Sequence, residues 1–316
     1  MLGAAHKPGA IPLRPLGLGD IYDGAFRIIR FNPKATVGSA VLVAAVSMAI
    51  PVLLTGLLTL LVDLSADGSG DLSDAEALAI LGTTGSLLVG VLLQGIGLIL
   101  VTGMIAHVAA AAAIGRRLSL GEAWAATRGS RWRLVGLTLL LGLMLLGIVA
   151  VYALAWVVVV VVMPTVGIVL FGVITVPAFI AFLAWWWVRV YYLPVPALML
   201  ERIGVTAAIG RAFRLTRQQF WRTLGIGLLT GIVTGIAGSV LAAPFSIAGQ
   251  VVPLAMEGSR YVALVTVVLA SLATVVQTAF VTPFSAAVTS LQYLDQRMRK
   301  EAYDVELMAR AGITSQ

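Results

Sequence analysis

The chain has 316 residues, of which 60% are hydrophobic and only 11% are charged, and its mean hydropathy is +1.02. A soluble domain needs far more polar side chains on its surface, so this composition excludes an ordinary soluble protein and predicts an integral membrane protein. The net charge of +7 falls in short basic clusters beside apolar segments. This pattern favours anionic lipid as the partner and argues against nucleic acid, for which the sequence shows no binding module.

The first part of the chain combines a polar helix with an apolar one. Residues 1–16 contain three prolines and are expected to form an irregular cytoplasmic tail. From Leu18, apolar and charged residues recur at helical spacing, which predicts a surface helix too polar to cross a membrane. The stretch from about Ala35 to Val62 is the first predicted crossing, because about 20 residues span the hydrocarbon core. The acidic loop 63–76 has no lysine or arginine and is expected outside.

A long uncharged segment, Ala77–Ile114, follows the acidic loop. It is long enough for two short crossings or for one helix that projects into the cytoplasm. Because the acidic loop precedes it and the Arg116–Arg117 pair follows it, the charge distribution favours one helix. Ser119 and Glu122 then have the spacing of a capping box, which predicts a second surface helix that runs to about Trp132.

Two apolar runs, about 134–163 and 165–193, are separated only by Pro164, which predicts a tight external hairpin. Tryptophans 185–187 are typical of an aromatic belt at a membrane surface. A third surface helix is expected to begin near Thr206.

The fifth predicted crossing is about Thr223–Ala243, and its glycines 227, 231 and 235 have a spacing that favours close approach of another helix. The sixth crossing begins near Tyr261. A charged cytoplasmic tail, residues 297–316, follows it.

Three windows of fourteen residues share one pattern. Ala25–Gly38, Ala123–Gly136 and Ala212–Gly225 each have alanine first, an aromatic residue second, arginine sixth and glycine fourteenth. The windows begin 98 and 89 residues apart, and each leads into an apolar segment. Such spacing indicates an internal repeat. The membrane domain, residues 17–296, is therefore expected to contain three units, at about 17–115, 116–202 and 203–296.

The predicted fold is an all-α integral membrane protein with six transmembrane helices, arranged as three hairpin repeats. Each hairpin follows a cytoplasmic amphipathic interfacial helix, and a pseudo-threefold axis along the membrane normal relates the units. Arg30, Arg128 and Arg217 should then occupy equivalent places at the cytoplasmic interface.

The charges support this topology. Of the 21 lysines and arginines, 20 fall in segments placed inside and only Arg260 falls outside, whereas six of the 14 acidic residues are external. By the positive-inside rule, the sequence predicts a multi-pass protein of the bacterial cytoplasmic membrane with both termini in the cytoplasm.

Three segments, Arg14–Pro33, Leu193–Gly225 and Tyr293–Glu306, resemble the bacterial glycerophosphoryl diester phosphodiesterase membrane-domain family and its actinobacterial relatives. The resemblance implies a six-helix membrane module that is fused to a phosphodiesterase in some members and stands alone in others. It is expected to stand alone here. A phosphodiesterase barrel would need more than about 200 further residues, so the resemblance does not imply that activity.

The sequence offers no catalytic or metal-binding constellation and implies no cofactor. Its two histidines, His6 and His107, are far apart, and it contains no cysteine. Polar residues inside a membrane often mark a transport pathway. Gln94 and Gln277, in the second and sixth crossings, are uncharged and are expected instead to hydrogen-bond a facing helix.

The basic surface helices are the remaining candidate site. We expect a cytoplasmic collar of arginines to contact lipid headgroups: Arg27, Arg30, Arg128, Arg131, Arg211, Arg214, Arg217 and Arg222. Glu201 and Arg202 are expected to form a structural ion pair between neighbouring helices. These features predict a non-catalytic membrane protein that binds or handles anionic lipid. The alternatives are a scaffold or subunit of an export or envelope-synthesis complex, with a membrane or cytoplasmic protein partner, and, less favoured, a membrane-embedded lipid enzyme.

Overall fold

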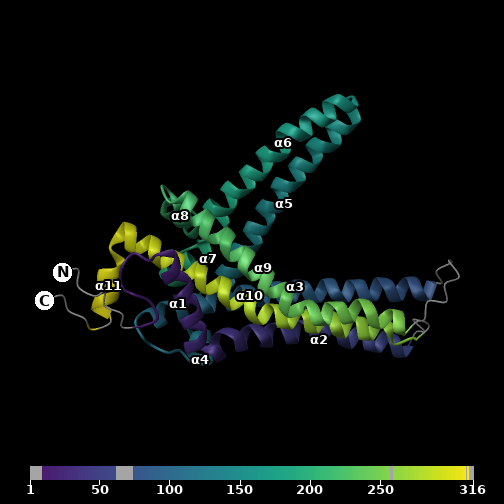
Figure 1. Cartoon of the computed structure of the whole chain (residues 1–316), viewed down its shortest axis with the longest axis horizontal. Helices are drawn as coiled ribbons and strands as arrows, with labels where there is room; N and C mark the ends of the chain where they lie inside the picture. Colours follow the sequence, from purple (N-terminus) through teal and green to yellow (C-terminus); the bar gives the residue numbers. More distant parts are fainter. Residues whose placement is uncertain (1–8, 62–73, 257–258, 311, 313–316) are drawn as a thin grey trace.

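A computed structural model of the chain describes residues 9–61, 74–256, 259–310 and 312, and these residues form helices without any strand. Most of the acidic loop after the first crossing, together with His6 and Glu257, lies outside the described residues. The elements, shown in Figure 1, are α1 (Leu18–Phe31), the π-helical segment η1 (Lys34–Gly38), α2 (Ser39–Leu61), α3 (Asp74–Ala113), α4 (Leu120–Ala126), α5 (Arg131–Val162), α6 (Thr165–Trp186), the π-helical segment η2 (Trp187–Tyr191), α7 (Pro194–Glu201), α8 (Val205–Thr216), α9 (Phe220–Ala255), α10 (Val262–Glu301) and α11 (Tyr303–Arg310).

Within the described residues, six helical stretches are long and apolar enough to cross a membrane. They lie in η1 with α2, in α3, in α5, in α6 through α7, in α9 and in α10. The chain is therefore a multi-pass helical membrane protein by the length and composition of its helices.

The structure confirms two predictions made from local pattern. α3 is one unbroken helix of 40 residues, and about 60 Å of helix is twice the thickness of the hydrocarbon core. Ser119 and Glu122 form the capping box, in which the Ser119 hydroxyl accepts from the Glu122 N–H and Glu122 accepts from the Ser119 N–H. The helix that they begin ends earlier than expected, at Ala126 instead of Trp132. A turn containing Gly129, whose φ is +85°, separates it from α5.

Four of the long helices, α2, α3, α9 and α10, pack side by side (Figure 1). Small residues let their backbones approach one another. A methyl group added at Gly97 of α3 would lie 2.3 Å from Val43 Cγ1 of α2, and one added at Gly238 of α9 would lie 2.8 Å from Val281 Cγ2 of α10. Close packing at these glycines holds the four helices together as a bundle.

The α5–α6 pair forms an arm that rises away from this bundle (Figure 1). The two helices join at Met163–Pro164, and the rings of Tyr152 and Phe179 stack between them at a centroid distance of 3.9 Å. Most apolar side chains of the arm remain exposed. The three pairs are therefore unevenly spaced, which departs from the expected threefold arrangement. α5 and α6 make a close glycine contact with each other, at Gly172 and Trp156, while the first and third pairs pack together in the bundle.

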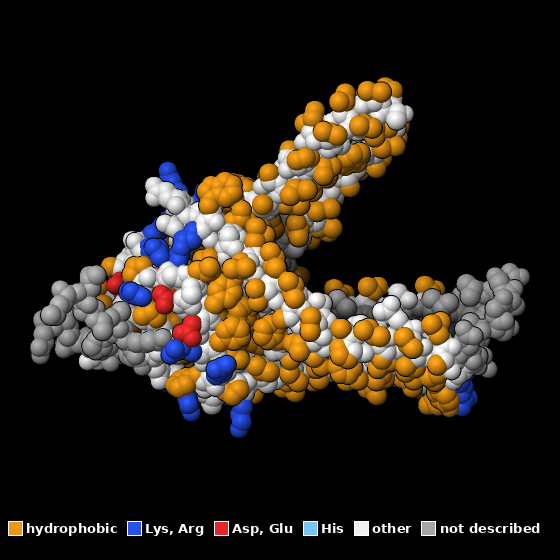
Figure 2. Space-filling view, in the orientation of Figure 1, with side chains coloured by type: hydrophobic (Ala, Val, Ile, Leu, Met, Phe, Trp, Pro, Cys, Tyr) orange, Lys and Arg blue, Asp and Glu red, His pale blue; other side chains and the backbone are white. Residues whose placement is uncertain are grey.

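Charged side chains gather at the end of the molecule that α1, α8 and α11 occupy, while hydrophobic side chains cover the arm and the bundle (Figure 2). The segment that precedes the membrane domain in the sequence and the segment that follows it both pack at this charged end. Ile11 and Leu16, in the segment expected to be an irregular tail, are fully buried there. Tyr303 and Leu307 of α11 are also buried, so the charged C-terminal segment is a packed helix at least to residue 310.

The glycine strip of α9 differs from its expected role. A methyl group at Gly227 would lie 2.4 Å from the Trp187 ring, but at Gly231 and Gly235 it would meet no described atom within 4 Å. Close helix contact instead occurs at Gly238. Regular spacing indicates which glycines share a face, but the neighbouring helix decides which part of that face is covered.

We expect Gly238→Leu to destabilise the bundle by about 1–3 kcal/mol, because the added side chain must displace Val281 and Gln277 on α10. The matched control is Gly235→Leu, which adds the same side chain to an open part of the same helix. Thermal unfolding of the purified protein in detergent measures both effects. Equal unfolding temperatures for the two variants would contradict this packing.

Candidate functional site

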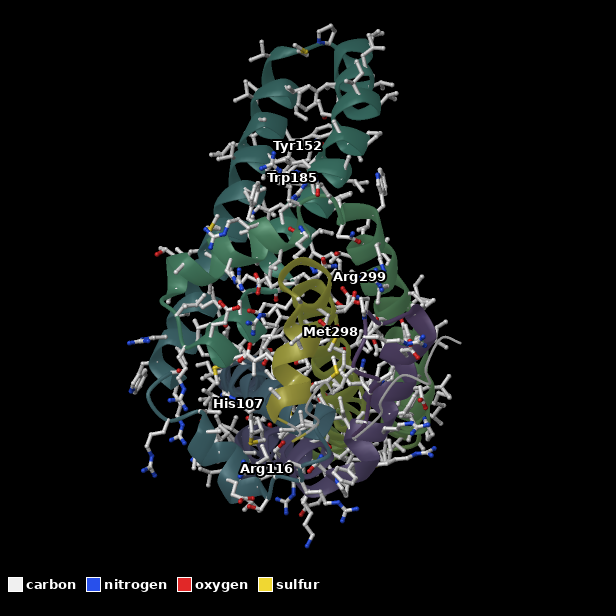
Figure 3. The ribbon with its side chains drawn as sticks, turned by 90° about the vertical axis from the view of Figure 1, so that its left-hand side faces the viewer. His107, Arg116, Tyr152, Trp185, Met298 and Arg299 are labelled. Carbon is white, nitrogen blue, oxygen red and sulfur yellow. The ribbon has the colours of Figure 1, made fainter. Side chains whose placement is uncertain are left out.

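The last two turns of α10 organise the charged end of the molecule. Residues four apart share one face of a helix, so Tyr293, Arg297 and Glu301 form one row. Asp295 and Arg299 form a second row. Figure 3 shows this end face-on, with Met298 and Arg299 near its centre and Arg116 toward its edge. Each row makes a separate polar network with other helices.

Asp295 is fully buried and holds the N-terminal segment. Its carboxylate accepts the backbone N–H of Leu16 at 2.8 Å and the Arg299 Nε at 2.9 Å, and it also accepts Arg222 Nη1. The Leu16 carbonyl accepts Arg222 Nη2 at 2.6 Å and Arg299 Nη2 at 2.8 Å. Both backbone groups of Leu16 are therefore bound. We call Leu16, Arg222, Asp295 and Arg299 the Asp295 clamp.

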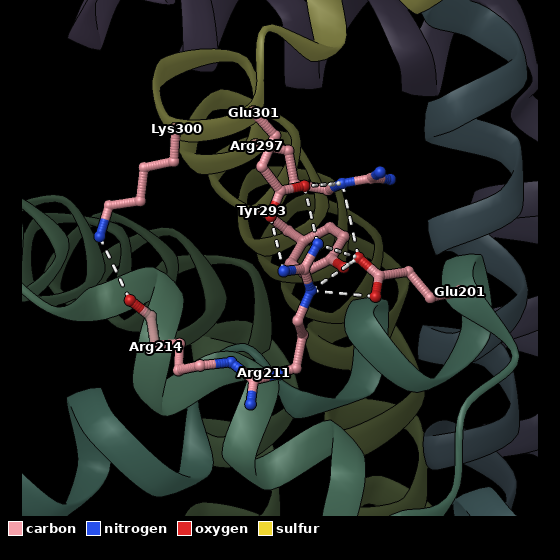
Figure 4. A network of polar contacts seen from close by, with 7 residues as sticks. All are labelled: Glu201, Arg211, Arg214, Tyr293, Arg297, Lys300 and Glu301. Carbon is pink, nitrogen blue, oxygen red and sulfur yellow. Dashed lines mark hydrogen bonds and ion pairs between the residues drawn. The ribbon is translucent and has the colours of Figure 1, made fainter.

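The second network joins α7, α8 and α10 (Figure 4). Arg211 of α8 lies between two carboxylates, with Nη2 2.8 Å from Glu201 Oε1 and Nη1 2.6 Å from Glu301 Oε1. The Tyr293 hydroxyl donates to Glu201, and Arg297 Nε lies 3.0 Å from Glu301 Oε2. Burial acts to lower the pKa of Arg211, but hydrogen bonds and charge attraction from Glu201 and Glu301 outweigh burial and raise its pKa. The guanidinium stays charged.

This geometry corrects the expected pair of Glu201 and Arg202. The ion pairs of Glu201 recorded for the described residues go to Arg211, at 2.8 Å, and to Arg297, at 3.5 Å. Arg202 ends α7 with a φ of +53°, and its carbonyl accepts Arg133 Nη1 at 3.3 Å. Glu201 thus joins α7 to the arginine-containing helix α8, as expected, but through a residue ten positions away.

The eight arginines expected to contact lipid fall into two groups. Three of them face protein partners. Arg211 and Arg222 pair with carboxylates, and Arg131 donates to Thr127 Oγ1 at 2.9 Å while stacking on the Trp124 ring at 3.9 Å. The other five have exposed side chains: Arg27, Arg30, Arg128, Arg214 and Arg217. Sequence spacing does not separate these groups, because members of both lie in or next to the short helices and the first turns of the long helices that follow.

Two of the exposed arginines border an open pocket of about 400 Å³ at this end. It is lined by Arg27, Arg30 and Phe31 together with Gly9, Ala10 and Gly115. Arg117 stacks on the Phe31 ring at 4.2 Å, and Arg27 pairs with Asp23 at 2.8 Å. The pocket thus combines cationic groups with an aromatic ring. Such a combination suits an amphipathic ligand that has an anionic group and an apolar part.

Two exposed tryptophans were not singled out by sequence reasoning. Trp132 and Trp221, in the first turns of α5 and α9, are 87% and 80% exposed. Both stand at the tenth position of the repeated windows, where the first window has Lys34. That shared position was the available signal. Tryptophan is enriched where a membrane meets water, so the pair indicates the level of that boundary at the charged end.

The intramembrane glutamines have different surroundings. Gln94 Nε2 of α3 donates to Thr278 Oγ1 of α10 at 3.0 Å, in a buried contact between facing helices. Gln277, the neighbour of Thr278, has an exposed side chain beside Gly238. Gln94 therefore has the expected helix contact. No group of three or more acidic or histidine side chains in the described part of the chain is placed to hold a metal ion.

No protein-family model, curated protein or solved structure matches the chain. The geometry of the charged end and of the membrane helices therefore carries the functional argument.

We expect Asp295→Asn to destabilise the protein by about 3 kcal/mol, because Arg222 and Arg299 lose the buried carboxylate that pairs with them. Asp23→Asn is the control, since the exposed pair of Asp23 and Arg27 contributes at most about 0.5 kcal/mol. Denaturant or thermal unfolding gives the comparison. Limited proteolysis near Leu16 should increase only in Asp295→Asn, and an unchanged cleavage pattern would argue against the clamp.

Proposed function

We propose that the chain is a non-catalytic multi-pass membrane protein that binds anionic lipid headgroups at its charged end. The observation that carries this proposal is the exposure of Arg30, Arg128 and Arg217, which share the sixth position of the three repeated windows. Arg30 lies in the last turn of α1, Arg128 and Arg217 come just after α4 and α8, and each arginine precedes a long apolar helix. Cations at this level of a membrane attract anionic headgroups, at about 1 kcal/mol per residue.

Residues at matching positions of the three repeated windows are buried to the same extent, which supports the equivalence of the windows. Their first residues, Ala25, Ala123 and Ala212, are all fully buried. Their second residues, Phe26, Trp124 and Phe213, are 42%, 44% and 41% exposed. Equal burial at matching positions is what repeated units in similar surroundings should have. It supports three copies of one surface helix, although the arm places the second pair of crossings differently.

The exposed tryptophans and the arginine pocket support the lipid assignment. An arginine one turn from an exposed aromatic ring can contact a phosphate while the ring lies among the upper acyl chains. The pocket of Arg27, Arg30 and Phe31 has this combination. The proposed site is therefore a set of separate headgroup contacts around the charged end.

In this proposal the charged end faces the cytoplasm of a bacterium, with both termini on that side. The distribution of arginine and lysine supports this orientation. The resemblance to the phosphodiesterase membrane-domain family stays a prediction.

Cysteine labelling tests the orientation, because the natural chain has no cysteine. We expect Ser259→Cys, between α9 and α10, to react with a membrane-impermeant maleimide in intact bacteria. Gly121→Cys, in α4 with open space around it, should react only after the membrane is opened. The reverse pattern would invert the proposed topology.

For the lipid assignment, we expect the triple variant Arg30→Gln, Arg128→Gln, Arg217→Gln to lose at least about tenfold in preference for phosphatidylglycerol over phosphatidylcholine. Native mass spectrometry of the purified full chain with mixed lipids measures this ratio. Arg260→Gln, an exposed arginine at the opposite end, is the control and should keep the preference.

An unchanged lipid preference in the triple variant would overturn the headgroup assignment. If the variant then lost a protein partner recovered by crosslinking in cells, the scaffold alternative would replace it.

A further inference from the structure

A second pocket lies within the membrane domain, where the arm meets the bundle. It has a volume of about 360 Å³, within the range of pockets that hold small ligands. Its wall comes from α3, α5, η2, α7 and α10. Its hydroxyl groups include those of Thr102, Thr138, Tyr192, Thr282, Ser285 and Thr289. None of the described residues that line it carries a charge.

Three of these hydroxyls already donate their protons within their own helices, so toward a ligand they can only accept a hydrogen bond. Thr102, Thr138 and Thr289 donate their protons to carbonyls of Leu98, Leu134 and Ser285, at 2.8, 3.1 and 2.8 Å. Each oxygen keeps a lone pair on the side away from its donated proton. A ligand that satisfies these acceptors must supply a hydrogen-bond donor, and the uncharged wall favours a neutral one such as an alcohol O–H.

The Tyr192 hydroxyl is a hydrogen-bond donor, so it requires an acceptor on the ligand. It is buried and lies close to the Thr289 hydroxyl, but it forms no hydrogen bond of normal geometry with a described residue. A buried polar group without a partner costs free energy, so this hydroxyl is expected to find one when the protein is in its membrane. Ser285 and Thr282 line the same pocket and are partly exposed. These groups can donate to carbonyl oxygens of a ligand.

An apolar pocket adjoins the hydroxyl-lined one, and Trp187 and Tyr191 belong to both. This second space, of about 400 Å³, is lined mainly by leucine, isoleucine and tryptophan side chains of α5, α6 and α9. A hydroxyl-lined space that opens beside an apolar one suits a molecule with a small polar head and a long hydrocarbon chain.

We infer that these adjoining pockets bind a neutral diacylglycerol-type lipid. The free hydroxyl of such a lipid donates to one of the threonine acceptors, its ester carbonyls accept from Tyr192 and Ser285, and an acyl chain lies against Trp187. A phospholipid fits the polar part poorly, because its phosphate would be buried without a cation. The site is separate from the exposed arginines and does not depend on the proposed headgroup contacts.

Native mass spectrometry of the full chain tests this site with three probes: dioleoylglycerol, its 3-acetyl derivative, and a prenol of similar chain length. The acetyl derivative lacks the free hydroxyl, and the prenol lacks the ester carbonyls. We expect dioleoylglycerol to bind about threefold to tenfold more tightly than either, as the loss of one or two hydrogen bonds implies. Equal binding of all three would overturn the inference, as would tighter binding of the prenol.

Near-isosteric variants identify the groups that bind. Tyr192→Phe and Thr289→Val should each weaken dioleoylglycerol binding about threefold or more while phosphatidylglycerol binding is retained. Tyr152→Phe is the matched control, because its hydroxyl bonds Thr175 within the arm and lies outside the pocket. A loss in the control equal to that in Tyr192→Phe, or no loss in either pocket variant, would contradict the assignment. The variant without Arg30, Arg128 and Arg217 should bind dioleoylglycerol normally, so the two proposals can fail separately.

Discussion

A buried carboxylate must be paired, and in this protein that constraint fixes the whole charged end. Asp295 is satisfied only when the segment at Leu16, the start of α9 and the last turns of α10 come together. Those contacts set the position of α1, which follows Leu16 directly. The second network, around Arg211, fixes α7 and α8 against the same turns of α10. One helix end thus positions α1 and α8, which carry or directly precede four of the five exposed arginines, Arg27, Arg30, Arg214 and Arg217.

Away from this end, different forces hold the helices. Lipid is as apolar as a leucine side chain, so burying leucine against leucine adds little stability inside a membrane. The bundle depends instead on close approach at glycines and on hydrogen bonds such as that of Gln94 with Thr278 and that of Tyr22 with Thr230. The α5–α6 arm has neither kind of contact with α9 or α10 along its outer part and stands apart (Figure 1). This separation leaves room for the two adjoining pockets at its base.

The sequence was sufficient where the signal is local. Apolar length located the six long helices, the loop charges favoured one helix at α3, and Ser119 with Glu122 marked the start of α4. It was insufficient where a partner is distant. Glu201 pairs across ten residues with Arg211 and not with its neighbour, because tertiary packing sets the distance between charges. For the same reason, periodicity could not show that Arg211 and Arg222 face inward, or that the proline-containing segment before α1 is buried.

The Asp295 clamp also has a consequence for how the protein is made. Leu16 and Asp295 are separated by 279 residues, so the clamp cannot close until nearly the whole chain has been synthesised and its last helix inserted. Until then Leu16 lacks the two side chains that α10 contributes, those of Asp295 and Arg299. Contacts between such distant residues form late in folding, because a long loop must close first. Closure of the clamp therefore marks completion of the chain, and a product that stops before α10 leaves an unprotected N-terminal segment that a protease can recognise.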